Sequence, residues 1–255
     1  MDGKLNRLLR DLPEGLVVDS AWLRARGYST SLCSQYVSAG WLERVAGRVY
    51  RRPRGELTWR QVVISLQTLL GRDLVVGGRT ALELQGFAHY LTQDVRDVHL
   101  YGDEPAPTWL DALSLGVAFH HHARARLFDP GPAGQADVRT LPWGQWNMVV
   151  STPERAVLEL LDELPARESF HQVDMMMEGL SSLSPKRLKT LIRDCRSVKA
   201  KRLFFYFADR HPHPWRRHLS PDSFDLGSGK RMLVKGGRLD ARYRITVPRD
   251  LDAVS

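Results

Sequence analysis

Residues 29–54, STSLCSQYVSAGWLERVAGRVYRRPR, decide the fold of the N-terminal part of the chain. A serine that can cap a helix precedes the segment 30–40, in which Cys33, Tyr36 and Val37 share one face at i, i+3 and i+4 spacing. We expect that face to be buried. Small polar side chains occupy the opposite face: Thr30, Ser31, Ser34, Gln35 and Ser38. Their hydroxyl and amide groups could hydrogen-bond to base edges and phosphates in a DNA groove.

An arginine-rich hairpin is predicted over residues 41–54. Apolar residues recur there at strand-like positions, and the Ala46-Gly47 pair predicts a tight turn between the two strands. Five arginines lie along the hairpin and its exit: Arg44, Arg48, Arg51, Arg52 and Arg54. These cations could neutralise phosphates, or they could protect an edge strand from aggregation.

Two shorter helices are predicted upstream of this stretch. The first, over residues 4–12, has leucines at helical spacing and ends at Pro13. The second, over residues 21–27, can be capped by Asp19 or Ser20. The order of two helices, a polar-faced helix and an Arg-lined hairpin is typical of a winged helix-turn-helix. The sequence therefore predicts a DNA-binding domain over residues 1–56, with a structural or protein-docking winged helix as the alternative.

Residues 57–255 predict a larger, mixed α/β domain, which places the whole chain in the α+β class. Apolar periodicity indicates helices over residues 57–70, 79–87, 154–164, 186–197 and 198–210. Strands are expected near residues 73–78, 94–102 and 117–128, and a closing hairpin over residues 225–248. The methionines at positions 175–177 are interpreted as soft core filling.

The net charge of +8 is unevenly distributed along the chain. Residues 1–56 hold ten Lys and Arg against six Asp and Glu, residues 57–185 hold nine against sixteen, and residues 186–249 hold eighteen against five. A polyanionic partner would explain basic ends around an acidic middle, although a solvated basic face is equally consistent with the counts. The cations that define the basic C-terminal third are Lys186, Arg187, Lys199, Lys201, Arg202, Lys230, Arg231 and Lys235.

Three of these cations occupy an unusual position. Lys199, Lys201 and Arg202 lie at the start of a predicted helix, where positive charge opposes the helix dipole. Such a placement suggests that an anion binds there.

An enzymatic alternative arises at Gly77-Gly78, between a predicted strand and a helix. Nucleotidyltransferases hold triphosphate on the backbone amides of such a turn and bind divalent metal through two nearby carboxylates. The candidate carboxylates here are Asp94 and Asp97, but Asp97 shares its strand with His99 rather than with a second acid. We therefore favour a structural Gly turn and expect no catalytic site. Gly227-Ser228-Gly229-Lys230 lacks the Walker spacing and carries no phosphate-loop interpretation either.

The histidine run at residues 120–122 is the main candidate for metal binding. Because side chains alternate along a strand, only His120 and His122 could share a ligand set, and the neighbouring sequence suggests no third ligand. Cys33 and Cys195 are far apart and lack a CxxC partner. We accordingly expect exposed histidines or polar contacts, with no metal and no cofactor.

The chain contains no apolar run that approaches the ~20 residues needed to span a bilayer. Its first residues mix charge with leucine and lack the apolar core of a signal peptide. A cytoplasmic location without membrane association is therefore expected.

The order of motifs resembles that of the AbiEi antitoxins, the regulators of type IV toxin–antitoxin systems. The similarity rests on GWLERVAGRVYRR (40–52), on GGRTALELQGF (77–87) with STPERAVLELLDEL (151–164), and on SVKAKRLFFYFADRHPHPW with LGSGKRMLVKGGRLDARYRITVP (197–248). These motifs span nearly the whole chain, and the last is the most specific. The chain departs from the usual pattern in the loop HHHARARLFDPGPAGQ (120–135).

The resemblance implies a repressor that binds inverted repeats in its own promoter through the N-terminal domain. It also implies that the C-terminal domain counteracts a nucleotidyltransferase-like toxin without forming a stable complex. On this reading the major groove is contacted by Ser29, Thr30, Ser31, Ser34 and Gln35, and phosphates or the minor groove by the five hairpin arginines. The C-terminal basic surface could extend the DNA footprint or bind RNA, and direct docking of an acidic toxin stays open.

Overall fold

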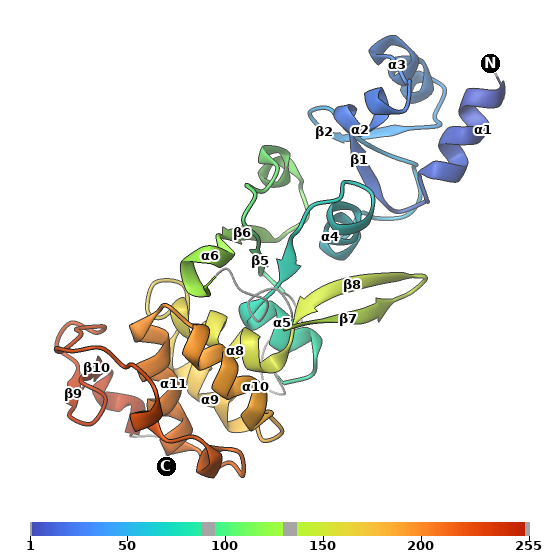
Figure 1. Cartoon of the computed structure of the whole chain (residues 1–255). Coiled ribbons are helices and arrows are strands. Elements are labelled where there is room, and N and C mark those ends of the chain that lie inside the picture. Colours follow the sequence, from blue (N-terminus) through green and yellow to red (C-terminus); the bar gives the residue numbers. More distant parts are fainter. Residues whose placement is uncertain (1, 88–94, 130–136, 253–255) are drawn as a thin grey trace.

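The computed structural model describes residues 2–87, 95–129 and 137–252. Figure 1 shows an elongated molecule with the N-terminal helices at one end and the β9–β10 hairpin at the other. The α+β class and the division into an N-terminal winged helix and a larger mixed domain, as expected from the sequence, are confirmed.

The N-terminal part is a winged helix. Its elements follow in the order α1 (Asp2–Asp11), β1 (Val17–Asp19), α2 (Ser20–Ala25), α3 (Thr30–Ser38), β2 (Glu43–Ala46) and β3 (Val49–Arg51). The three strands form an antiparallel sheet in the order β1-β3-β2. The side chain of Asp19 accepts a bond from Trp22 N at 2.8 Å, and Ser29 Oγ accepts one from Leu32 N at 3.2 Å. Both predicted caps therefore start their helices.

A separate small core holds these elements together. Its members come from α1, α2, α3 and the wing and are buried side chains: Leu8, Leu12, Val18, Trp22, Leu23, Tyr28, Cys33, Tyr36, Leu42 and Tyr50. Cys33 and Tyr36 are buried as their spacing predicts, and Val37 packs against the same cluster. The opposite face of α3 does not pack against this core.

The wing turns one residue later than the sequence suggested. Ala46 pairs with Val49, so the turn consists of Gly47 and Arg48 rather than Ala46 and Gly47. Arg48 adopts φ 63°, a left-handed conformation that non-glycine residues seldom take.

The larger domain is built on a five-stranded mixed sheet. Its strands are β4 (Val75–Val76), β5 (Asp97–Tyr101), β6 (Ala118–His122), β7 (Val138–Trp143) and β8 (Trp146–Ser151), in the order β6-β5-β4-β8-β7. The β5–β6 and β4–β8 pairs are parallel and the other two are antiparallel. Helices α5 (Gly78–Leu84) and α6 (Arg124–Leu127) and the 3₁₀ turn Thr108–Ala112 connect the strands.

Four helices follow the sheet: α8 (Pro153–Asp162), α9 (Phe170–Gly179), α10 (Pro185–Asp194) and α11 (Val198–Arg210). Helix α8 is buried on every side, between α5 and α11 (Figure 1). Three 3₁₀ turns (Arg216–His218, Pro221–Ser223, Arg249–Asp252) and the hairpin β9 (Arg238–Asp240)–β10 (Ile245–Val247) complete the C-terminal end. Met176 and Met177 are buried in the core as expected, whereas Met175 is exposed.

Helix α4 (Trp59–Thr68) joins the two parts. Val17 N of the winged helix donates to the buried Ser65 Oγ at 2.9 Å, and Leu16, Val17 and Val49 belong to the same buried cluster as α4 and the central sheet. On its other side, the Gln67 amide bonds to both Val149 N and Val149 O of β8 at 2.9 Å. Packing thus continues across residues 56 and 57, and the domain boundary placed there stays a prediction.

Candidate nucleic-acid interface

The face of α3 opposite the core is exposed and small. Its side chains are all exposed to solvent: Ser29, Thr30, Ser31, Ser34, Gln35 and Ser38. In the described part of the chain, their hydroxyl bonds stay within this face: Ser29 Oγ lies 3.1 Å from Ser31 Oγ, and Ser34 Oγ donates to Thr30 O at 3.1 Å. The face therefore makes no contribution to tertiary hydrogen bonding and is available to a groove.

Two of the five hairpin arginines are exposed on the wing itself. Arg48 projects from the turn and has no ion-pair partner among the described residues. Arg44 is exposed on β2, where its Nη2 lies 3.4 Å from Tyr50 Oη, and it lines a hollow together with residues 113–115. Arg48 is thus the free cation at the wing tip, and Arg44 faces the junction with the larger domain.

The other three hairpin arginines do not lie freely on the wing surface, which corrects the placement expected from the sequence. Arg51 is buried and donates to Glu43 at 2.7 Å. Arg52 is half-buried and bonds to Leu9 O at 2.9 Å and to Glu14 at 2.7 Å. Arg54 is exposed but also pairs with Glu14. The physical reason is that Glu43 pairs with Arg51, and Glu14 is shared by Arg52 and Arg54, which the hairpin pattern alone does not reveal.

Sequence reasoning missed the cations of α2. Arg24 and Arg26 are both exposed, and the guanidinium of Arg26 stacks on Trp22 at 3.7 Å from the ring centroid. In a helix-turn-helix the helix before the recognition helix crosses the DNA backbone, so basic residues there are the signal that could have identified them.

The start of α11 was expected to expose three cations, and the structure corrects this as well. Lys199 Nζ donates to Asp162 O and to Leu164 O (2.8 Å) at the C-terminal end of α8, and Lys201 is 6% exposed. A cation at the C-terminus of α8 is favoured by the dipole of that helix. The position of Lys199 therefore has an explanation within the protein: its charge opposes the dipole of α11 but complements the dipole of α8.

Arg202 is an internal residue, 1% exposed. Its guanidinium donates hydrogen bonds of 2.7–3.4 Å to five backbone carbonyls: Leu226, Gly227, Ser228, Gly229 and Arg244. A guanidinium has five N–H donors, so this loop of carbonyls can satisfy the whole group. Burial and the charges of Arg231 and Arg244 lower the pKa of Arg202 from its usual value.

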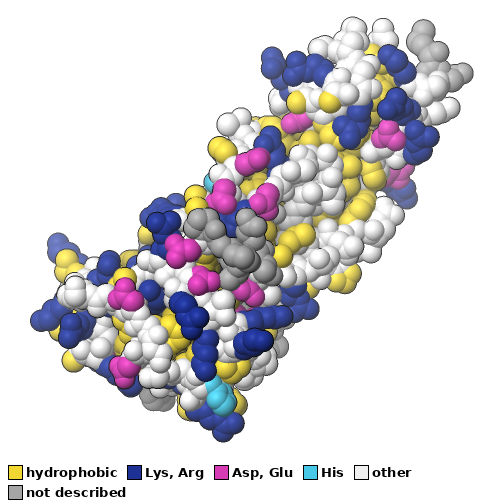
Figure 2. All heavy atoms as spheres, viewed as in Figure 1, with side chains coloured by type: hydrophobic (Ala, Val, Ile, Leu, Met, Phe, Trp, Pro, Cys, Tyr) yellow, Lys and Arg dark blue, Asp and Glu magenta, His cyan; other side chains and the backbone are white. Residues whose placement is uncertain are grey.

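Of the eight cations named from the sequence in the C-terminal third, five are exposed: Lys186, Arg187, Lys230, Arg231 and Lys235. Arg187 lies 3.8 Å from Glu154 and 3.9 Å from Asp137. Lys230, Arg231 and Lys235 form no ion pair with any described residue, and Met232 beside them is 74% exposed. We call Lys230, Arg231, Met232 and Lys235 the distal basic loop. Figure 2 shows Lys and Arg side chains gathered at both ends of the molecule, with most of the acidic side chains of this face between them.

The Gly77-Gly78 turn holds a protein carboxylate. Glu159 of α8, fully buried, accepts hydrogen bonds from Gly78 N at 2.9 Å, from Ser151 Oγ at 3.1 Å and from Arg155 Nε at 2.7 Å. A Cβ added at Gly77 would lie 2.3 Å from this carboxylate and 2.4 Å from the ring of Tyr101. The glycine thus allows close packing of the turn against α8, and the amide that would bind a phosphate already has an anionic acceptor.

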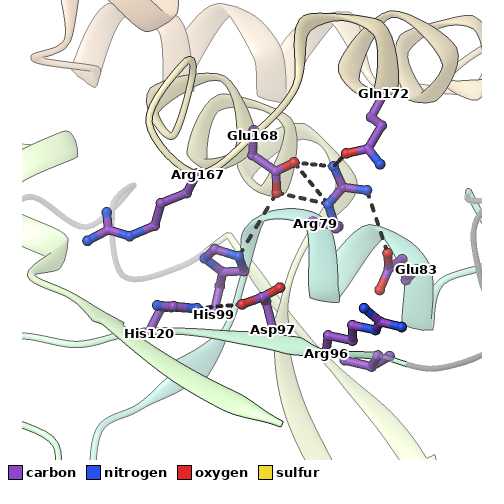
Figure 3. Close-up of a pocket in the computed structure, with 10 residues that line it drawn as sticks. Arg79, Glu83, Arg96, Asp97, His99, His120, Arg167, Glu168 and Gln172 are labelled. Atoms are coloured by element: carbon purple, nitrogen blue, oxygen red, sulfur yellow. Dashed lines mark hydrogen bonds and ion pairs between the residues drawn. The ribbon is translucent and has the colours of Figure 1, made fainter.

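A pocket of about 470 Å³ opens beside this turn, as Figure 3 shows. Arg79 crosses it to Glu168, with Nε 2.8 Å from Oε1, and reaches Gln172 at 3.0 Å. Asp97 lies at the edge, 2.7 Å from His120 Nε2. Asp94 falls outside the described residues, so the proposed carboxylate pair cannot be placed together.

Of the histidines in the 120–122 run, His121 is exposed as expected, whereas His120 and His122 are partly buried and make polar contacts. Register pairs His99 of β5 with His120 of β6, and His99, His120 and His122 lie on one face of the sheet. His99 Nδ1 lies 3.0 Å from His122 Nε2, and His122 Nδ1 lies 3.1 Å from Glu163 Oε1. The third and fourth members of this cluster, His99 and Glu163, come from segments that the sequence did not connect with the run.

The surroundings lower the pKa of two members of this cluster, His99 and Glu163. Burial, and then the neighbouring His122 and His120, lower the pKa of His99 to about 4. Burial alone would raise the pKa of Glu163, but the hydrogen bond and charge of His122 and the bond from Arg167 outweigh it and lower the pKa to about 2. A neutral imidazole therefore lies beside an ionised carboxylate at neutral pH.

Cys33 and Cys195 are both buried free thiols. Burial raises the pKa of Cys195 to about 12, so this thiol is protonated and unreactive at neutral pH. Among the described residues, no helix has the length and apolar character that a membrane-spanning segment requires.

Comparison with solved structures supports the fold. The crystal structure of the RV2827C protein from Mycobacterium tuberculosis matches with a TM-score of 0.58 at 18% sequence identity, covering 95% of this chain and 89% of that one. At this identity the similarity shows the fold alone. A comparison with curated proteins gave no match.

Two family models together match nearly the whole chain. Residues 1–93 match the N-terminal domain of AbiEi antitoxins, described as transcriptional regulators. Residues 95–248 match a second model, described as a transcriptional regulator and AbiEi antitoxin of type IV toxin–antitoxin systems. The first match covers the winged helix together with α4, β4 and α5, and the second covers the chain from β5 to residue 248. The chain therefore belongs to the AbiEi antitoxin family of transcriptional regulators in type IV toxin–antitoxin systems.

Proposed function

We propose that this protein represses its own operon by placing α3 in the major groove of inverted repeats and the wing tip against the DNA backbone or minor groove. The observation that carries the proposal is the face of α3: it is exposed, composed of small polar side chains, and makes no tertiary hydrogen bond with the residues that the structure describes. Such a face lets the helix backbone come close to base edges. Arg48 at the wing tip adds an unpaired cation.

The residues proposed to contact DNA are those whose side chains are exposed to solvent. The exposed polar residues of α3 and its cap are assigned to the DNA groove: Ser29, Thr30, Ser31, Ser34 and Gln35. Arg48 of the wing and Arg24 of α2 are assigned to phosphates. Arg51 and Arg52 are assigned to internal ion pairs instead, and Arg44 and Arg54 to secondary positions beside the junction. Each phosphate neutralised by a free cation releases counterions, so binding should weaken as salt rises.

We assign the counteraction of a nucleotidyltransferase-like toxin to the larger domain, without a stable complex. The distal basic loop supports a second contact with nucleic acid, because its three cations have no ion-pair partner among the described residues. The chain around β9, which this loop precedes, lies at the opposite end of the molecule from α3 (Figure 1). A catalytic role for the Gly77-Gly78 turn is disfavoured by the Glu159 carboxylate bonded to Gly78 N.

The direct test is an electrophoretic mobility shift with DNA from upstream of the protein's gene, titrated against salt and unrelated competitor. Point variants are preferable to deletion of residues 1–56, because that deletion would uncover the part of α4 that packs on Leu16 and Val17. Gln35→Ala should blur operator preference, and Arg48→Ala should weaken binding to all sequences while lowering the salt slope by about 1. Arg126→Ala, which removes an exposed cation on α6 in the acidic middle of the chain, is the charge-matched control.

Three outcomes would redirect the proposal. Binding that any DNA competes away, unchanged in Gln35→Ala, would show that α3 does not read an operator. A toxin complex that survives high salt would favour direct docking over counteraction without a complex. Labelling of protein or RNA by NTP and magnesium that is lost in Asp97→Ala would establish the enzymatic alternative.

A further inference from the structure

We propose that His99, His122 and Glu163 form a binding site for a transition-metal cation of the Zn²⁺ type. One nitrogen of each imidazole and one carboxylate oxygen lie within 4.8 Å of one another. Two imidazoles and one carboxylate form a donor set that suits zinc and leaves a fourth position open. The expectation of no metal rested on the lack of a third ligand near the histidine run, and the fold supplies ligands from β5 and from the end of α8.

The donors are held in place by rigid elements. His99 and His122 lie on paired parallel strands, and the ring of Tyr101 stacks on His122 with centroids 4.6 Å apart. Glu163 is the residue that ends α8, where the helix dipole favours a cation. The side chains are 3%, 13% and 9% exposed for His99, His122 and Glu163. Burial of this kind keeps water from competing strongly for a bound ion.

Carboxylates outside the donor set complete the surroundings. Glu168 Oε1 lies 4.0 Å from His99 Nε2, on the side where it can orient the ring as an outer-shell partner. His99 lines the 470 Å³ pocket, and His122 and Glu163 line a second cavity of about 250 Å³. The cluster therefore lies between two cavities, either of which gives an ion a path to the donors.

One side chain competes for the same carboxylate. Arg167 is 54% exposed, lines both cavities and donates from Nη1 to Glu163 Oε2 at 3.0 Å. Ligand atoms around a tetrahedral zinc lie about 3.4 Å apart, and the donor atoms here lie within 4.8 Å of one another, so small side-chain movements would close the three donors around the ion. The guanidinium of Arg167 neutralises part of the negative charge that the Glu163 carboxylate would offer to the ion. Removal of that guanidinium should consequently strengthen metal binding, whereas removal of any donor should weaken it.

The test is calorimetric titration of the chelator-treated full chain with Zn²⁺, together with the absorption spectrum of the Co²⁺ form. We expect one Zn²⁺ per chain above the background of other histidines and the intense visible bands of a tetrahedral Co²⁺ centre. His122→Ala and Glu163→Gln should each lower the affinity by more than about 10-fold. Arg167→Gln should raise it, and His121→Ala, on the opposite face of the same strand, should leave it unchanged.

Circular dichroism of each variant checks that it is folded. The expected gain in Zn²⁺ affinity of Arg167→Gln cannot be caused by unfolding, because unfolding would weaken the site. The proposal is overturned if the native chain binds Zn²⁺ no more tightly than about 10 μM. It is equally overturned if binding persists in His122→Ala and Glu163→Gln, because the ion would then lie on other histidines. Unchanged affinity in Arg167→Gln would overturn the proposed competition between Arg167 and the ion for Glu163.

Discussion

At the scale of single residues, the arginines divide into those that organise the backbone and those that face solvent. Arg202 and Arg51 carry the same charge as Lys230 and Arg48, yet the first two are buried, Arg202 against backbone carbonyls and Arg51 beside Glu43. A buried cation stabilises only when its donors are satisfied. The neighbouring carbonyls and carboxylates, rather than the residue type, therefore decide which cations can reach a partner.

Replacing Arg202 should destabilise the C-terminal end strongly. Arg202→Met removes the donors from five carbonyls and should lower the free energy of unfolding by at least about 3 kcal/mol. Denaturant unfolding measures the change. Lys230→Met, an exposed neighbour in the same loop, should stay within about 0.5 kcal/mol of the native chain. Equal effects of the two substitutions would contradict the structural role of Arg202.

A second residue-scale prediction concerns acid stability. Burial alone would raise the pKa of Asp174, but bonds from His211 (2.8 Å) and Arg210 (2.9 Å) lower it below its usual value. A depressed carboxyl pKa contributes stability above the unfolded value, near 3.9, which is lost as pH falls through the folded pKa. Asp174→Asn should thus destabilise the protein at neutral pH and lose that deficit below about pH 4. A deficit that is independent of pH would show that the charge of Asp174 is not the cause.

At the scale of elements, the wing and α3 each present a surface that does not pack against the core. The core of the winged helix uses the inner face of α3, and the wing turn places Arg48 in a left-handed conformation. That conformation costs an L-residue about 1 kcal/mol relative to glycine. Retaining an arginine there is consistent with a role that glycine could not fill.

Arg48→Gly should separate stability from binding. The substitution relieves the left-handed strain and should raise the free energy of unfolding by about 0.5–1 kcal/mol, while removing a phosphate contact and lowering the salt slope by about 1. Chemical denaturation and mobility shifts at several salt concentrations measure the two effects. Loss of stability together with unchanged DNA binding would exclude both arguments.

At the scale of the whole molecule, α4 links the winged helix to the larger domain. Ser65 is fully buried, accepts from Val17 N and donates to Gln61 O at 2.6 Å. Two basic surfaces at opposite ends (Figure 2) are thereby held on one packed framework. The orientation of one end could in this way affect the binding of a nucleic acid or toxin at the other end.

Ser65→Ala tests this link. It leaves Val17 N without its acceptor and should lower the free energy of unfolding by about 1–3 kcal/mol. Hydrogen exchange should show faster exchange at Val17, and Ser182→Ala, at an exposed position, should change neither measurement. If the Val17 amide were protected equally in both variants, the bond to Ser65 would not join the two parts.

The sequence by itself determined the local structure. Capping residues, apolar spacing and glycines act within one or two turns, so they placed the helices of the winged helix, the buried face of α3 and the class of the larger domain. The motif order also led to the correct family. These features depend on neighbours in the chain, which a sequence displays directly.

Only the tertiary structure decided which side chains meet across distance. His99 and His122 are 23 residues apart and come together through strand register, and Glu163 joins them because α8 ends above that face. The same packing buried Arg202 against a loop 24 to 42 residues away. Periodicity indicates whether a side chain faces inward or outward, but strand register and helix packing determine which residue it contacts. For this reason, cations that were expected on the surface are internal hydrogen-bond donors, and histidines that are far apart in the sequence form one cluster.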